Sequence, residues 1–245
     1  MFRVEETHWW YRALHRLIFQ TLEAELPDWR DRAIIDVGCG TGAILKQLGN
    51  PGKNVGIDLA PEAISFCRQR GLNNVQQGDI HALPFPDASF DAVICSSVLY
   101  HQWVSDVEGA VREMHRVLRP GGALLIIAPA FPFLHSAHDE AVMTARRFRK
   151  GQIRRLLENQ NFEIRRLTYW TTFLFPLAVA ARTFGGSKMG RDFETEGASF
   201  TQRAFTRIMA LELRLLRSIS LPFGVALLAV ARKQTPTRAP YNSVS

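Results

Sequence analysis

The stretch from position 33 to position 48 constrains the fold more than any other part of the chain. Its apolar, partly β-branched start, Ala33 to Val37, suits a buried parallel strand, and helix-compatible residues follow from Ala43 to Leu48. Between them lie Gly38, Gly40 and Gly42, which can adopt backbone angles closed to other residues and let a ligand lie against the main chain. The pattern predicts an α/β fold in which a strand turns into a helix around a small ligand.

The glycines alone are compatible with two different cofactors. Gly38, Gly40 and Ala43 satisfy the dinucleotide pattern G-x-G-x-x-G/A, and Asp58 ends the next expected strand, which taken alone favours NAD. Asp36 discriminates, because a carboxylate just before the glycines disfavours a pyrophosphate. S-adenosyl-L-methionine has no phosphate, and its ammonium and sulfonium groups are attracted by an acidic entrance. Asp36 therefore favours S-adenosyl-L-methionine.

Four motifs then follow one another along the chain: D-V-G-C-G-T-G, G-I-D, G-D-I and R-V-L-R-P-G-G. In this order they resemble the class I S-adenosylmethionine-dependent methyltransferases, and most closely the branch that includes ubiquinone and menaquinone biosynthesis methyltransferases. The resemblance covers roughly residues 32–169 and the last strand. It implies a Rossmann-like sheet of seven strands in the order 3-2-1-4-5-7-6, with strand 7 antiparallel and helices on both faces.

The resemblance also implies which residues bind the cofactor. The acid at the end of the second strand, Asp58, would accept hydrogen bonds from the ribose hydroxyls, and Asp79 would bind the adenine amino group beside the backbone amide of Ile80. The full predicted set comprises Asp36, Gly38, Cys39, Gly40, Gly42, Asp58, Leu59, Asp79, Ile80 and Ser96.

The chain divides into a predicted helical lid (1–31), the methyltransferase domain (32–233) and a polar tail (234–245) predicted to be disordered. Within the domain, residues 170–221 form a helical insertion between strands 6 and 7, where the family usually has a brief turn. Its second helical run carries a stripe of apolar residues at helical spacing: Ile208, Leu211, Leu215 and Ile219. The insertion could cap the acceptor pocket, form a dimer face or lie in a membrane interface.

Aromatic and basic side chains outside the motifs are candidates for substrate binding. His8, Trp9 and Tyr11 belong to an aromatic cluster that would either cover the sheet edge by packing or close over the site and shield it from water. Tyr100 is expected at the carboxyl edge of the fourth strand, where open α/β sheets bind ligands. Arg146 lies in a basic cluster, which is either a solvated helix start or an anion site.

Histidines are the candidates for a general base, because an oxygen or activated carbon acceptor must lose a proton near neutral pH. His138 paired with Asp139 is the first candidate, His101 the second and His8 the third. The segment resembles a pattern H-D…H-x-R-R-Y of bacterial relatives, but Thr144 stands near the place of the second histidine. An amine acceptor would need no base.

The formal charge of +7 and pI near 9.8 are compatible with anionic partners, or simply with a solvated surface. Three cysteines, Cys39, Cys67 and Cys95, lack metal-ligand spacing and indicate a reducing compartment, so we predict no metal site. With no secretory h-region and no apolar stretch of about 20 residues, the sequence predicts a cytoplasmic protein, with peripheral contact to the inner membrane as an alternative.

The sequence as a whole predicts an enzyme that transfers a methyl group by in-line displacement to a small-molecule or lipophilic metabolite. Nucleic-acid methylation is an alternative, weakened by SSVLYH in place of an N-P-P-[YF]-type motif and by the lack of an RNA-binding module, so no specific nucleic acid is expected. A further alternative is a cofactor-binding partner subunit without catalysis. The sequence is also compatible with a homodimer.

Overall fold

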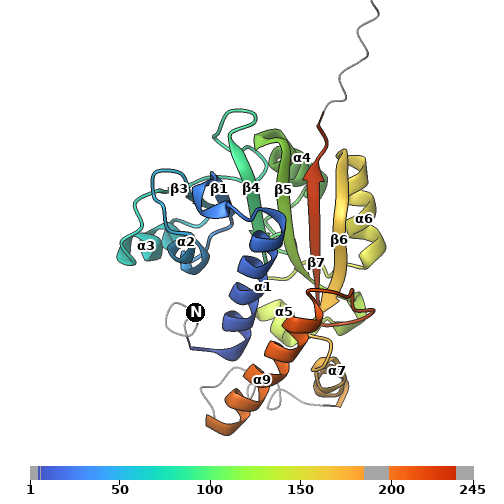
Figure 1. Ribbon diagram of the computed structural model, residues 1–245. Helices are drawn as coiled ribbons and strands as arrows, with labels where there is room; N and C mark the ends of the chain where they lie inside the picture. The colour runs from blue at the N-terminus through green and yellow to red at the C-terminus, as the bar shows by residue number, and fades with distance from the viewer. Residues whose placement is uncertain (1–4, 6, 185–198, 236–245) are drawn as a thin grey trace, which may run out of the picture.

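The computed structural model describes residue 5, residues 7–184 and residues 199–235. Its centre is a sheet of seven strands in the order β3-β2-β1-β4-β5-β7-β6 (Figure 1). The strands are β1 Ile34–Val37, β2 Val55–Asp58, β3 Val75–Gln77, β4 Phe90–Ser96, β5 Leu118–Pro129, β6 Phe162–Trp170 and β7 Ala226–Lys233.

One strand runs against the others. β7 pairs antiparallel with both β5 and β6, with Leu125 opposite Val230 and Leu167 opposite Ala229. The other four pairings are parallel. The predicted fold class is therefore confirmed in strand order and in the direction of strand 7, and the carboxyl ends of six strands meet at one edge.

Helices cover both faces of the sheet. They are α1 Trp9–Glu25, α2 Ala43–Leu48, α3 Pro61–Gln69, α4 Val107–Val117, α5 Ala137–Ala141, α6 Lys150–Asn159, α7 Phe175–Phe184 and α9 Ser199–Leu215, with short 3-10 turns at Trp29–Asp31 and Pro132–Leu134. Side chains alternate along each strand, so Ile34 belongs to the apolar cluster that includes residues of α1, α2 and α9, whereas Ile35 belongs to the cluster that includes residues of α4 and α6. Each face thus has its own apolar core.

The R-P-G-G run forms the irregular start of β5. α4 ends at Val117 and β5 begins at Leu118, which pairs with Phe90 ahead of a register shift. Gly121, at φ +76, takes the positive angle within this irregular start of the strand. The motif is therefore a bulged strand entry.

The N-terminal segment and the insertion form one wall of the molecule. α1 packs against α9, and the Gln20 side chain donates a hydrogen bond to the Leu213 carbonyl at 2.9 Å. The predicted lid therefore contains one long helix, and the predicted insertion contains α7 and α9. Most of its Gly-rich link and of the tail predicted to be disordered lies outside the described residues.

The apolar stripe identified in the sequence of α9 lies mostly in solvent. Leu211 and Leu215 are 52% and 37% exposed, and Ile219, just beyond the helix, is 49% exposed; only Ile208 contacts the core. The buried side chains are instead Met209, Leu213 and Leu216, which also repeat at helical spacing. The helical spacing of apolar residues is therefore compatible with burial of either face of α9. The packed face also buries Glu212, whose carboxylate accepts hydrogen bonds from the segment that follows β6.

Across the described ranges, none of the helices has both the length and the apolar content that a membrane span requires.

Candidate functional site

A cavity of about 1540 Å³ runs along the carboxyl edge of the sheet. Residues at or just after the end of each of the six parallel strands line it, together with the first residue of the antiparallel strand β7. Sites for a single small molecule usually enclose about 300–1,000 Å³. The cavity therefore has room for two ligands side by side.

Glycines are required where β1 turns into α2. Gly38, Gly40 and Gly42 have φ angles of +74°, +54° and +80°. A Cβ atom at Gly38 would lie 2.2 Å from Cγ2 of Val98, so no larger residue fits there. Gly38 and Gly40 line the cavity, whereas Gly42 caps α2 and is not among the described lining residues. The predicted loop therefore presents bare backbone to a ligand.

Asp36 lies next to this loop and is 1% exposed. Burial, and to a smaller extent the nearby Asp58 carboxylate, raise the pKa of Asp36 to about 7. Its Oδ2 atom has no hydrogen-bond partner among the described residues. Because buried polar atoms are nearly always paired, this oxygen needs a donor or a cation. The ammonium and sulfonium groups of S-adenosylmethionine suit it, and a phosphate does not.

Asp58 is held in place by main-chain amides. Its Oδ2 accepts a hydrogen bond from Gly40 N at 2.8 Å, and its Oδ1 accepts one from Ala60 N at 3.0 Å. The carboxylate is partly exposed and lines the cavity, so it keeps lone pairs for ribose hydroxyls. The side chain of Leu59, 47% exposed, also lines the cavity.

The predicted adenine site follows β3. Asp79 and Ile80 both line the cavity, as does Ser96 at the end of β4. Asp79 also accepts hydrogen bonds from the backbone and ring of His81, and these bonds hold its pKa below the usual range. Cys39 lines the cavity as well, but its Sγ lies 3.9 Å from that of Cys67. The structure therefore gathers nine of the ten predicted cofactor residues beside one cavity, counting the adjacent Asp36.

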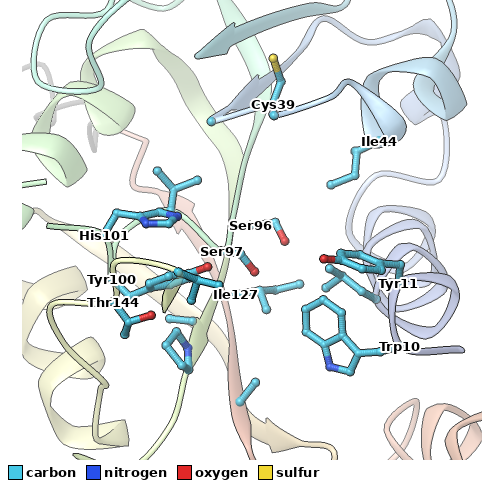
Figure 2. A pocket seen from close by; sticks show the side chains of 18 of the residues that line it. Trp10, Tyr11, Cys39, Ile44, Ser96, Ser97, Tyr100, His101, Ile127 and Thr144 are labelled. Atoms are coloured by element: carbon cyan, nitrogen blue, oxygen red, sulfur yellow. The ribbon is translucent and has the colours of Figure 1, made fainter. Parts of the chain in front are cut away.

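Residues near the start of the chain also line the cavity. Trp9 and Tyr11 line the cavity, and His8 caps α1 by accepting a hydrogen bond from Trp10 N at 3.3 Å. Figure 2 shows Trp10 and Tyr11 on the opposite side of the cavity from Tyr100 and His101. The aromatic residues near the start of the chain thus form a wall of the site.

Glu5 links the N-terminal segment to the glycine loop that follows β1. Its Oε2 accepts hydrogen bonds from the Thr41 hydroxyl and from Nη2 of Arg70, the latter at 3.1 Å. The side chains of Glu5 and Arg70 are only 5% and 4% exposed, so the ion pair is buried. The sequence alone did not indicate this role for Glu5, because no local pattern links positions 65 residues apart.

His101 and Tyr100 face the space opposite α1, next to Thr144 (Figure 2). Burial lowers the pKa of His101, so its ring is neutral at pH 7, and its Nδ1 has no partner among the described residues. Burial raises the pKa of Tyr100 to about 12, so it remains a phenol. A neutral imidazole with a bare ring nitrogen can accept a proton.

The segment after β5 places its charged groups differently from the expectation. Asp139 Oδ1 lies 2.7 Å from Nη2 of Arg147 in a buried ion pair, and Oδ2 accepts hydrogen bonds from Ser136. Arg147 and Asp139 line the cavity. Arg146 does not appear among the described lining residues, and its Nη1 donates to the Val104 carbonyl at 2.5 Å. The side chain of His138 lies outside the described part of the structure.

The fold and the site geometry are those expected of a class I S-adenosylmethionine-dependent methyltransferase. Residues 35–126 match the family described as a methyltransferase domain. A solved S-adenosylmethionine-dependent methyltransferase from Mesorhizobium loti shares the fold, with a TM-score of 0.58 and 19% identity over 88% of this chain and 97% of that one.

Two further similarities are to a curated relative and to another solved structure. Over 108 residues the chain is 44% identical to a malonyl-[acyl-carrier protein] O-methyltransferase of Serratia marcescens, covering 43% of this chain and 42% of that protein. The chain thus spans about half the length of the curated relatives it matches. The [4+2]-cyclase SpnF also shares the fold, with a TM-score of 0.58, 20% identity and coverage of 92% and 83%. The quinone branch is not specified by these matches and stays a prediction.

Proposed function

We propose that this chain transfers the methyl group of S-adenosylmethionine to a small, largely apolar organic molecule bound beside the cofactor. The observation that carries the proposal is one continuous cavity whose first half matches the cofactor and whose second half is walled by aromatic and aliphatic side chains. The bound cofactor supplies an electrophilic methyl group. The chain's own residues orient the two reactants, which typically contributes about 7–11 kcal/mol.

Individual residues have distinct tasks in this proposal. Asp36 and Asp58 hold the cationic amino-acid part and the ribose of the cofactor. Trp10 and Tyr11 exclude water from the methyl group. His101, neutral and with an unpartnered Nδ1, accepts the proton of a hydroxyl or carbon acceptor. The base role of His138 remains a sequence prediction.

A second candidate acceptor is the carboxylate of a malonyl group on a carrier protein, as the names of the relatives suggest. A carboxylate needs no base, but it needs a cation. Arg147 lies in the cavity wall, although its guanidinium already pairs with Asp139 at 2.7 Å. This pairing makes a carboxylate acceptor the weaker candidate. A homodimer, contact with a membrane surface and the cellular location stay predictions.

Calorimetric titration tests the donor. S-adenosylhomocysteine should bind with micromolar affinity and NADH should not, and binding of NADH alone would refute the proposal. Labelled S-adenosylmethionine should then be incubated with a hydrophobic phenol, a hydrophobic amine and a malonyl-carrier protein. Methylation of the phenol or the amine supports an apolar acceptor, and methylation of the carrier protein alone would establish the second candidate. Cofactor binding without turnover, even with cell extract, would indicate a protein that only binds the cofactor.

A further inference from the structure

The cavity continues beyond the strands that carry the cofactor motifs. Those motifs follow β1, β2 and β3, whereas the cavity also extends across β5, β7 and β6. Three strand spacings separate β4 from β6, a distance of about 14 Å. We call this extension the far half of the cavity; its lining residues are Ile127, Thr171, Leu174, Ala178, Val225 and Ala226. An acceptor of a few atoms would not need it.

Thr171 stands at the end of the far half, directly after β6. Thr171 is 4% exposed, and its φ angle is +61°. Such an angle is rare for a β-branched residue and costs conformational energy. Its Oγ1 is buried and has no hydrogen-bond partner among the described residues. Thr171 thus combines backbone strain with an unpaired hydroxyl at the wall of a cavity.

Neighbouring threonines show that the segment can satisfy such hydroxyls. Oγ1 of Thr172 donates a hydrogen bond to the Phe223 carbonyl. Oγ1 of Thr168 donates to the Tyr169 carbonyl at 3.0 Å and accepts from Leu221 N at 2.8 Å. Of these three threonines, Thr171 alone lines the cavity and lacks a partner. Its partner is therefore to be sought in a ligand.

The insertion fixes the backbone around this hydroxyl. Glu212 of α9 is fully buried, and its two carboxylate oxygens accept hydrogen bonds from Thr172 N at 3.0 Å and Phe173 N at 3.1 Å. On the other side, a Cβ atom at Gly224 would lie 2.3 Å from the Trp170 carbonyl oxygen, so the two backbones touch. A hydroxyl held between these supports is preorganised, which is what a specific binding contact requires.

We propose that the Thr171 hydroxyl is the polar anchor of an acceptor subsite. The acceptor is an elongated, mostly apolar molecule with a hydroxyl or carbonyl group at its β6 end, away from the atom that receives the methyl group. The apolar part lies against Leu174, Ala178 and Val225, and Oγ1 either donates to or accepts from the distal group. This inference rests on the proposed function, because it places the acceptor beyond the cofactor.

A matched pair of probes tests the subsite. 4-Hydroxybiphenyl and 4-methylbiphenyl differ in one polar group, and their affinities for the protein saturated with S-adenosylhomocysteine give a hydroxyl preference. In Thr171→Val the affinity for the hydroxyl probe should fall about fivefold while that for the methyl probe is unchanged, as expected for one neutral hydrogen bond. Thr171→Gly removes the hydroxyl and relieves the strained φ angle, so it should lose the preference while remaining folded.

The control is Thr172→Val, which removes a hydroxyl one position away that does not line the cavity. It should keep the hydroxyl preference of the wild type. An equal preference in the wild type, Thr171→Val and Thr171→Gly would overturn the subsite, as would failure of both probes to bind the loaded protein. Failure of the proposed function would appear separately, as a wild-type protein that does not bind S-adenosylhomocysteine.

Discussion

The affinity for S-adenosylmethionine should depend on pH through Asp36. In the ligand-free protein the pKa of this carboxyl is about 7, because the group is buried and lies near Asp58. A bound cation favours the ionised form and lowers that pKa. Affinity should therefore rise from pH 5.5 to pH 8, where the ionised fraction increases from about 3% to about 90%. The gain is about 30-fold, or about 2 kcal/mol.

Proton release gives a sharper measurement than affinity. In calorimetry with buffers of different ionisation enthalpy, binding should release about 0.9 protons at pH 6 and about 0.1 at pH 8, if the bound carboxyl is fully ionised. Asp36→Asn is the control, and in this variant both the proton release and the rise in affinity should disappear. The same pH dependence in the wild type and in Asp36→Asn would refute the assignment of this carboxyl to the cofactor.

Asp36→Asn should also affect stability: it should raise the stability of the ligand-free protein at high pH, whereas it lowers the affinity for the cofactor. The folded pKa of this group is raised above its unfolded value of 3.8, so the folded state binds the proton more tightly and loses stability as the pH rises from about 4 to 7. The uncharged asparagine avoids this loss. The Tm of the ligand-free variant at pH 8 should therefore exceed that of the wild type, although its cofactor affinity is at least tenfold lower.

Three other predictions concern particular contacts. Glu5→Gln removes the charge that faces Arg70 in a buried ion pair, so urea denaturation should show a loss of about 3 kcal/mol of unfolding free energy. Calorimetry should show a weaker affinity for S-adenosylmethionine. If both values are unchanged, the ion pair does not hold the N-terminal segment against the glycine loop. His101→Gln should preserve cofactor affinity and lower turnover of a phenol at least about 100-fold, and equal turnover would eliminate it as the base. Leu213→Ala should cost about 2–5 kcal/mol of unfolding free energy, whereas Leu211→Ser should cost less than about 0.5 kcal/mol, and similar losses would contradict the orientation of α9.

Local sequence patterns indicated the strands and the positions of the glycine loop and of Asp58 beside the cavity. Gly38 and Gly40 need positive φ angles, and Asp58 ends its strand, so their roles follow from neighbours within a few residues. Strand order came from the resemblance, and the structure confirms it. The chemistry of Asp36 also needed only its position before the glycines.

The rest depends on contacts between distant segments, which local patterns do not encode. Two helix faces of α9 were apolar enough to be buried, and the choice between them depends on where the Glu212 carboxylate finds backbone donors. Arg146 and Arg147 are adjacent in sequence, and only the fold decides which of them meets Asp139. The hydroxyl of Thr171 has no partner among the described residues and its φ angle is positive, and its sequence neighbours indicate neither.

The contact between α1 and α9 has a consequence for how the chain is made. Gln20 and Leu213, which join the two helices, are 193 residues apart. At about 5–20 residues per second, a ribosome needs about 10–40 s to synthesise the chain between them. During that interval the apolar side chains of α1 that later meet α9 have no partner. Synthesis rate and chaperone supply should therefore affect the yield of folded protein.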